Sequence, residues 1–294
     1  MGSNNDISLK ALAKINLGLD VVRRREDGYH EVRMIMQTIH LYDLLEIQKI
    51  REPEIQIVSN LSFLPVNENN LVYKAARLLQ EEFALTDGIS VKLTKRIPVA
   101  AGMAGGSTDA AAMLYAMNQL YDLGLSRREL MKRGVQIGAD VPYCLMRGTA
   151  LAEGIGEKLT QLPPMIKCPV LIAKPSISVS TKFVYQNLKL DEQTNHPDID
   201  ALMKDIREKD FDGVCAHMGN VLESVTIPNY PVIAEIKQQM MRSGAKASMM
   251  SGSGPTVFGL FEDGETAKRA LREMKRSGLA KQVYLTTIYN NRRK

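Results

Sequence analysis

The sequence predicts an α+β fold in two domains, residues 1–160 and 161–294. Strand-like and helix-like patterns intermix along the chain with no internal repeat and no regular β-α-β succession. A length of 294 residues suits one large or two medium domains. A buried strand pattern at Cys168–Ala173 opens the second half of the chain. Together these features indicate two mixed domains rather than one parallel sheet.

The first elements follow from hydrophobic periodicity. Ile7–Val22 alternates as a strand in its second half, and Val32–Ile57 alternates in pieces around Pro53, as antiparallel strands do. Asn69–Phe83 places apolar residues at helical spacing, which predicts a helix with one core-facing stripe. Ile89–Thr94 alternates apolar and polar residues and predicts a half-buried strand.

A glycine-rich loop follows that strand, within the stretch IPVAAGMAGGSTDAAA from Ile97 to Ala112. The helix-forming run Ala110–Leu120 comes next. A loop between strand and helix presents unpaired backbone N–H groups and the positive end of a helix dipole, which favour an anion, most often a phosphate. Ser107 or Thr108 is expected to cap the helix, and either hydroxyl can face a phosphate oxygen or its metal.

The common phosphate-loop patterns do not fit this loop. No Lys follows Gly105 or Gly106, so the Walker pattern is absent. The glycine spacing also differs from the dinucleotide-binding GxGxxG, and the protein-kinase tripeptides HRD and DFG do not occur. A plain turn is the alternative for a short glycine cluster. The small residues extend well beyond what a turn needs, because Ala100, Ala101 and Ala104 also lie in the loop.

A second candidate site is the segment Ile137–Cys144. Ser126 and Glu129 form a capping box that opens a helix ending near Gly138. Asp140 then lies between this helix end and a probable strand, since Pro142 favours an extended conformation before it. An Asp at such a place is commonly a turn former, and catalysis is the less frequent alternative.

The second half of the chain continues the α+β pattern. Gly148–Gly156 is predicted as a strand and a turn, and the polar stretch Asp191–Asp200 as a loop. Three further elements are a helix at Pro231–Arg242, a helix at Glu265–Ser277 and a strand at Val283–Tyr289.

Composition excludes several classes of function. A formal charge of +5 with 5% aromatic residues gives little support for nucleic-acid binding, whereas a mildly positive cleft for polyphosphate ligands agrees with it. No apolar run approaches the roughly 20 residues of a membrane span, and no signal-peptide pattern opens the chain. The three cysteines form no CxxC pair, so we expect neither disulfides nor zinc, in a cytoplasmic protein.

Three ordered motifs resemble those of the GHMP kinases, a family of ATP-dependent small-molecule kinases. The first is Ala13-Lys14-Ile15-Asn16-Leu17, the second is the glycine loop, and the third is Met249–Phe258. The chain departs from the family pattern at four positions, with changes that conserve size or hydroxyl chemistry at three of them. Those three are Met103 for Leu, Ala104 for Gly and Thr108 for Ser, and the fourth change is Leu12 for Pro.

Two further segments resemble one branch of that family, whose substrate is a cytidine diphosphate-linked sugar alcohol. They are the R-x-D-G-Y-H segment at Arg25–His30 and the G-A-D-V-P segment at Gly138–Pro142. The resemblance implies a ribosomal protein S5 domain 2-like N-terminal domain and a ferredoxin-like C-terminal domain. It also implies ATP and Mg²⁺ as cofactors, a role in isoprenoid (terpenoid) biosynthesis by the methylerythritol phosphate pathway, and a monomer or weak homodimer.

The resemblance also assigns roles to residues. Asp140 is implied as the catalytic base and Lys14 as the group that keeps it ionised. The third motif is expected to lie against the glycine loop. Nucleotide phosphates are expected at Pro98, Val99, Ala100, Ala101, Gly102, Met103, Ala104, Gly105, Gly106, Ser107 and Thr108, and the sugar-alcohol substrate at Asn16, Tyr29, His30, Thr181 and Tyr185.

Alternative functions remain at this point. One is a different GHMP kinase, acting on homoserine or mevalonate, which the Gly28-Tyr29-His30 segment disfavours. Another is a GHMP-fold binding protein without catalysis, which the presence of Lys14 and Asp140 disfavours. A basic RNA-binding module is the third, and the low aromatic content disfavours it.

Overall fold

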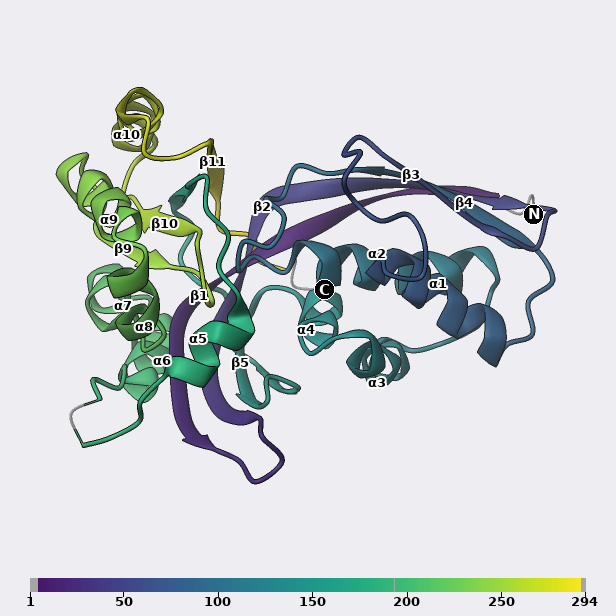
Figure 1. Cartoon of the computed structure of the whole chain (residues 1–294), viewed down its shortest axis with the longest axis horizontal. Coiled ribbons are helices and arrows are strands. Elements are labelled where there is room, and N and C mark those ends of the chain that lie inside the picture. Colours follow the sequence, from purple (N-terminus) through teal and green to yellow (C-terminus); the bar gives the residue numbers. More distant parts are fainter. Residues whose placement is uncertain (1–4, 193, 292–294) are drawn as a thin grey trace. The chain divides into compact units, whose positions relative to one another are not determined.

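A computed structural model describes residues 5–192 and 194–291, which pack as two compact units (Figure 1). Unit 1 contains the residues up to Ala13 together with Tyr42–Val99 and Ala104–Met146. Unit 2 contains Lys14–Leu41, Ala100–Met103 and the residues from Arg147 onward. This division differs from the predicted boundary at residue 160, because the long strands β1 (Asp6–Arg24) and β2 (His30–Ile50) each contribute residues to both units.

The sheet of unit 1 is built on the second half of β2. Leu44–Ile50 pairs antiparallel with β4 (Gly88–Thr94), and β4 pairs parallel with β3 (Ile55–Ser59). The crossover between β3 and β4 is the helix α1 (Leu71–Glu82). The chain therefore contains a β-α-β unit here, although the sequence shows no regular succession of them.

Four helices lie on one face of this sheet (Figure 1). They are α1, α2 (Gly105–Leu120), α3 (Arg127–Ile137) and α4 (Val141–Met146). Asn70 caps α1, and the predicted capping box of Ser126 and Glu129 is present at α3. Most residues of α2 are buried, because this helix packs against the three others. The helix that starts at the glycine loop is thus the core helix of unit 1.

The C-terminal part of unit 2 is a four-stranded antiparallel sheet. Its order is β11 (Gln282–Thr287), β7 (Pro169–Lys174), β10 (Val257–Leu260) and β9 (Ala247–Met250). The helices α9 (Val232–Arg242) and α10 (Gly264–Ser277) pack on this sheet and connect its strands. When the four strands are numbered 1 to 4 in chain order, their order across the sheet is 4-1-3-2. This is the ferredoxin-like arrangement expected for this domain.

The rest of unit 2 is built around the second half of β1 and the first half of β2. β5 (Thr149–Gly154) pairs with Val32–Gln37 of β2 and forms a hairpin with β6 (Lys158–Gln161), and β8 (Gly219–Asn220) pairs parallel with Gly18–Leu19 of β1. The remaining helices are α5 (Thr181–Asn187), α6 (Ile199–Glu208), α7 (Phe211–His217) and α8 (Glu223–Asn229). None of the helices in the described ranges combines the length and the apolar character that crossing a membrane requires.

Candidate active site

The glycine loop enters α2 without a side-chain cap. The N-cap residue is Ala104, which has a left-handed backbone (φ 55°), and α2 begins at Gly105, five residues before the predicted Ala110. The prediction that Ser107 or Thr108 caps the helix is therefore wrong, because both lie inside its first turn. Thr108 N donates to Ala104 O at 2.8 Å. The N–H groups that precede it are left facing out of the helix end, where an anion binds.

The two hydroxyls of this turn differ in exposure. Thr108 is 2% exposed and belongs to the core, whereas Ser107 is half-buried. A Cβ atom added to Gly138 would lie 3.9 Å from Ser107 Oγ, so the turn before Asp140 lies beside the start of α2. Of the two predicted hydroxyls, Ser107 is therefore the one available to a ligand.

Gly102 packs against the third motif within unit 2. Ser251 Oγ donates to Gly102 O at 2.9 Å. A Cβ atom at Gly102 would lie 2.1 Å from Ser251 O, closer than any van der Waals contact allows. The φ angle of Gly102 is +72°. The expected contact between the second and third motifs is present, and it requires glycine.

We expect Gly102→Ala to raise the KM for ATP by about tenfold or more, because the new methyl group displaces the loop and misplaced ligand groups reduce rates strongly. Gly124→Ala is the matched control. Gly124 has a similar φ of +67° but no atom within 4 Å of its added Cβ, so it isolates the backbone strain. Initial-rate kinetics measure both variants, and equal KM values for the two would show that the contact with Ser251 is not needed.

Lys14 and Asn16 lie on one face of β1, because residues two apart in a strand point the same way. Lys14 is 5% exposed and Asn16 is fully buried. Lys14 Nζ donates to Asn16 Oδ1 at 2.7 Å, and Lys14 N donates to Met103 O at 3.2 Å. A Cβ atom on Gly252 would lie 3.7 Å from Asn16 Oδ1. Residues of all three motifs therefore meet within unit 2.

Asp140 stands at the start of α4 in unit 1, and the prediction of a strand after it is wrong. Its carbonyl oxygen accepts the hydrogen bond of Cys144 N at 3.0 Å, the first of that helix. Pro142 lies in the first helical turn, where its missing N–H costs no hydrogen bond. The Asp140 side chain is half-buried. A carboxylate at a helix start is favourably placed relative to the helix dipole.

The predicted substrate residues of unit 2 form two contacts. The rings of His30 and Tyr185 are 5.1 Å apart between centroids and tilted by 42°. Burial lowers the pKa of His30, so its neutral imidazole offers one donor and one acceptor near neutral pH. Thr181, at the start of α5, places its Oγ1 atom 2.8 Å from Ser253 Oγ in the third motif.

Tyr29 lies apart from this ring pair and is 61% exposed. It ends a tight turn in which Arg25 N donates to Tyr29 O at 2.8 Å and Gly28 has a φ of +85°. Asp27 Oδ1 accepts from Tyr29 N at 3.1 Å. The turn is thus held by its own hydrogen bonds, and the Tyr29 ring is open to a ligand.

A buried charge cluster that no local sequence pattern signals lies next to the glycine loop. Lys95 Nζ donates to Asp109 Oδ2 at 2.6 Å and to Asp43 Oδ2, and all three side chains are buried. Asp43 Oδ1 also accepts the N–H of Ile97 at 2.8 Å. A Cβ atom at Gly105 would lie 3.3 Å from Lys95 Nζ. The cluster therefore supports both the entry to the loop and the start of α2.

Asp109 is the unusual member of this cluster. Burial raises its pKa well above the usual range of a carboxyl group, and its Oδ1 atom has no hydrogen-bond partner in the described chain. Desolvation of the carboxyl group is the main cause of this shift, and the nearby ammonium group of Lys95 opposes it. In the residues that the structure describes, no group of three or more His, Cys, Asp or Glu side chains is arranged to hold a metal ion.

Two family models match the chain, the GHMP kinases N-terminal domain at residues 70–148 and the GHMP kinases C-terminal domain at residues 202–280. The fold and the three converging motifs are those of this class of small-molecule kinases. A 4-diphosphocytidyl-2-C-methyl-D-erythritol kinase from Lachnospira eligens is 59% identical over 96% of this chain and 98% of its own length. The same kinase from Lachnoclostridium phytofermentans is 55% identical over 97% and 98%.

Solved structures agree with these relatives. A crystal structure of 4-(cytidine 5'-diphospho)-2C-methyl-D-erythritol kinase matches with a TM-score of 0.84 and 31% identity, over 97% of this chain and all of the other. A homoserine kinase from Cytophaga hutchinsonii, 21% identical with a TM-score of 0.80 over 98% of this chain and 96% of the other, shares the fold. The chain belongs to the GHMP kinase family, among the 4-diphosphocytidyl-2-C-methyl-D-erythritol kinases. The predicted family and fold are confirmed.

Proposed function

We propose that this chain transfers the γ-phosphoryl group of ATP to the 2-hydroxyl of 4-diphosphocytidyl-2-C-methyl-D-erythritol, in the methylerythritol phosphate pathway of isoprenoid biosynthesis. The observation that carries the proposal is the 59% identity, over nearly the whole chain, to a kinase of that name. GHMP kinases that act on homoserine share only the fold with this chain at 21% identity, so they are not favoured as models of its substrate.

The glycine loop binds the nucleotide in this proposal. Backbone N–H groups from Ala101 to Ser107 hold the phosphates, since small residues there let the main chain approach a ligand closely. Bound Mg²⁺ would neutralise charge between the phosphates, and the half-buried Ser107 hydroxyl is the oxygen donor that fits such an ion. Phosphoryl transfer has a loose transition state, so positioning and charge stabilisation supply most of the catalysis.

Asp140 accepts the proton of the attacking 2-hydroxyl as that oxygen bonds to the γ-phosphorus and ADP leaves. The ammonium group of Lys14 neutralises part of the charge on the transferred phosphoryl group in this proposal. The buried position of Lys14 and its hydrogen bond to Asn16 Oδ1 support this role, because a buried ammonium group needs partners that orient it.

Tyr29, His30 and Tyr185 hold the cytosine in this proposal. A pyrimidine offers a face for stacking and an edge for hydrogen bonds, and the contact between His30 and Tyr185 supplies both kinds of group at one place. Thr181, through its hydroxyl beside Ser253, lies near the transferred phosphoryl group.

We expect Tyr185→Ala to raise the KM for the cytidyl substrate by about tenfold to a hundredfold, since stacking of a base on an aromatic ring contributes roughly 1–3 kcal/mol. Tyr29→Ala should act in the same direction. Tyr185→Phe keeps the ring, and Tyr115→Ala removes an exposed tyrosine of α2, so both serve as controls with unchanged KM. KM is measured from initial rates at saturating ATP. An unchanged KM for the cytidyl substrate in both Tyr185→Ala and Tyr29→Ala would argue for another substrate of the family.

The direct test of function is ATP turnover with and without 4-diphosphocytidyl-2-C-methyl-D-erythritol, beside homoserine and mevalonate. We expect turnover with the cytidyl compound alone. Faster turnover with either other compound would reject the proposed substrate, and ATP binding without any turnover would favour a binding protein. The molecular size of the protein, measured under turnover conditions, tests the prediction that it is a monomer or a weak homodimer.

A further inference from the structure

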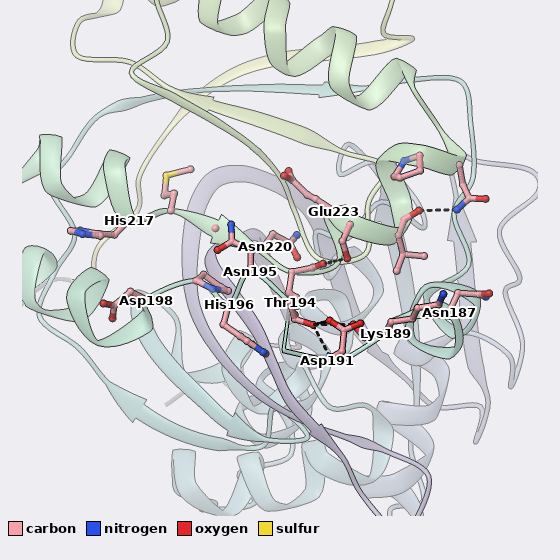
Figure 2. A pocket seen from close by; sticks show the side chains of 18 of the residues that line it. Asn187, Lys189, Asp191, Thr194, Asn195, His196, Asp198, His217, Asn220 and Glu223 are labelled. Carbon is pink, nitrogen blue, oxygen red and sulfur yellow. Dashed lines mark hydrogen bonds between the residues drawn. The ribbon is translucent and has the colours of Figure 1, made fainter.

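A polar cavity of about 940 Å³ lies within unit 2, away from the residues assigned above (Figure 2). Described residues between Asn187 and Asp198 form one part of its lining, and residues between Ala216 and Asn229 form a second side. Asn220 of β8 and Glu223 of α8 belong to this second side. Their polar atoms already have protein partners, and backbone atoms of the third motif are among them.

Asn220 holds two carbonyl groups of that motif. Its Nδ2 atom donates to Met250 O at 2.9 Å and to Gly252 O at 2.8 Å, and its Oδ1 atom accepts from Leu222 N at 3.0 Å. The side chain is 8% exposed. Both amide protons and the amide oxygen are used, so the orientation of the amide group is fixed by its surroundings.

Glu223 accepts a hydrogen bond from the same part of the third motif. Its Oε1 atom accepts from Met250 N at 2.8 Å, while Oε2 pairs with Lys237 Nζ at 2.5 Å. The N–H and the C=O of Met250 are therefore each bound by a side chain from the cavity wall. The loop that follows is closed by Ser251 N donating to Thr256 O at 2.9 Å.

This loop contacts two parts of the proposed site. Ser251 Oγ donates to Gly102 O, and Ser253 Oγ lies 2.8 Å from Thr181 Oγ1. A shift of the loop moves both contacts at once, and displacements of about 1 Å reduce catalytic rates strongly. The side chains of Asn220 and Glu223 reach neither Gly102 nor Thr181 themselves, so their effect passes through the loop.

We propose that Asn220 and Glu223 are positioning residues for phosphoryl transfer, which set the place of Gly102 and Thr181 through the loop Ser251–Thr256. The proposal rests on the proposed function, since it assigns Gly102 to the nucleotide and Thr181 to the acceptor. A misplaced loop then weakens nucleotide binding and slows turnover together.

The test is Asn220→Asp, which keeps the shape of the side chain but turns an oxygen toward two carbonyl oxygens. We expect its dissociation constant for ADP, measured by calorimetry, to rise at least fivefold and its kcat to fall at least tenfold. Asn229→Asp is the matched control, because Asn229 lines the same cavity and donates its Nδ2 only to Val225 O within α8. Its ADP affinity and kcat should equal those of the wild type.

Glu223→Gln and Glu223→Ala complete the test. Glutamine keeps one oxygen for Met250 N but loses the ion pair with Lys237, so it should weaken ADP binding less than alanine, which also releases that N–H. Wild-type ADP affinity and kcat in both Asn220→Asp and Glu223→Ala would overturn the proposal. If the wild-type protein shows no turnover with the cytidyl substrate, the proposed substrate is rejected. The ADP measurements still decide whether Asn220 and Glu223 are positioning residues.

Discussion

Asp140→Asn is expected to lower kcat by about a hundredfold to ten-thousandfold, because the amide cannot take the proton of the attacking hydroxyl. The shape of the side chain is conserved, and the backbone bond from Cys144 N to Asp140 O does not involve it. ADP affinity should therefore stay within about twofold of the wild type. Single-turnover kinetics at saturating substrates separate the chemical step from binding.

Asp122→Asn is the control for this change, since Asp122 is an exposed carboxylate in the same unit and asparagine tolerates its left-handed backbone. Lys14→Met should lower kcat as well, and the double variant should be little worse than the slower single one if the two groups act as a unit. A near wild-type rate for Asp140→Asn would show that another group is the base. If the fold loss of kcat in the double variant equals the product of the losses in the two single variants, Lys14 and Asp140 act independently.

Lys95→Met should lower the free energy of unfolding by about 3–5 kcal/mol, because removing one partner of a buried ion pair leaves an uncompensated charge. Asp43 would lose the ammonium group of Lys95 and be left with the backbone N–H groups of Arg96 and Ile97 as its donors. Urea unfolding followed by circular dichroism gives the change, provided that the slope with denaturant is unaltered.

Lys92→Met is the matched control, because Lys92 lies in β4, which ends just before Lys95, and pairs with Glu46, but its side chain is 65% exposed. Exposed pairs of this kind contribute about 0–1 kcal/mol. Asp109→Asn should cost less than Lys95→Met, since the amide oxygen can still accept the hydrogen bond of Lys95 Nζ and Lys95 keeps its pair with Asp43. Equal losses for Lys95→Met and Lys92→Met would show that the cluster does not stabilise the loop.

Local patterns predicted most elements of this fold. The alternation of Ile89–Thr94 gave the strand β4, and the capping box at Ser126 gave the start of α3. Two local expectations were wrong for identifiable reasons. Proline is compatible with an extended chain and with a first helical turn, and at Pro142 the helix prevails. A left-handed alanine at a helix start, as at Ala104, is rare enough that hydroxyl capping was the natural expectation.

The site was predictable as far as its motifs are continuous in sequence. Lys14, the glycine loop and Met249–Phe258 were predicted as a site from the three motifs taken together and in order, and the fold brings residues of all three together in unit 2. The side chains that support them gave no local signal. Lys95 and Asp43 are 52 residues apart, and Asn220 and Met250 are 30 apart, so only the folded chain shows that they are partners.

The contact at Gly102 bears on drug resistance. An inhibitor that recognises the main chain of this loop contacts a position where every other amino acid would collide with Ser251 O. Substitutions that block such a compound there would also disable the enzyme. A compound that binds the main chain of this loop would therefore be less open to loss of affinity by substitution at Gly102 than a compound that binds side chains.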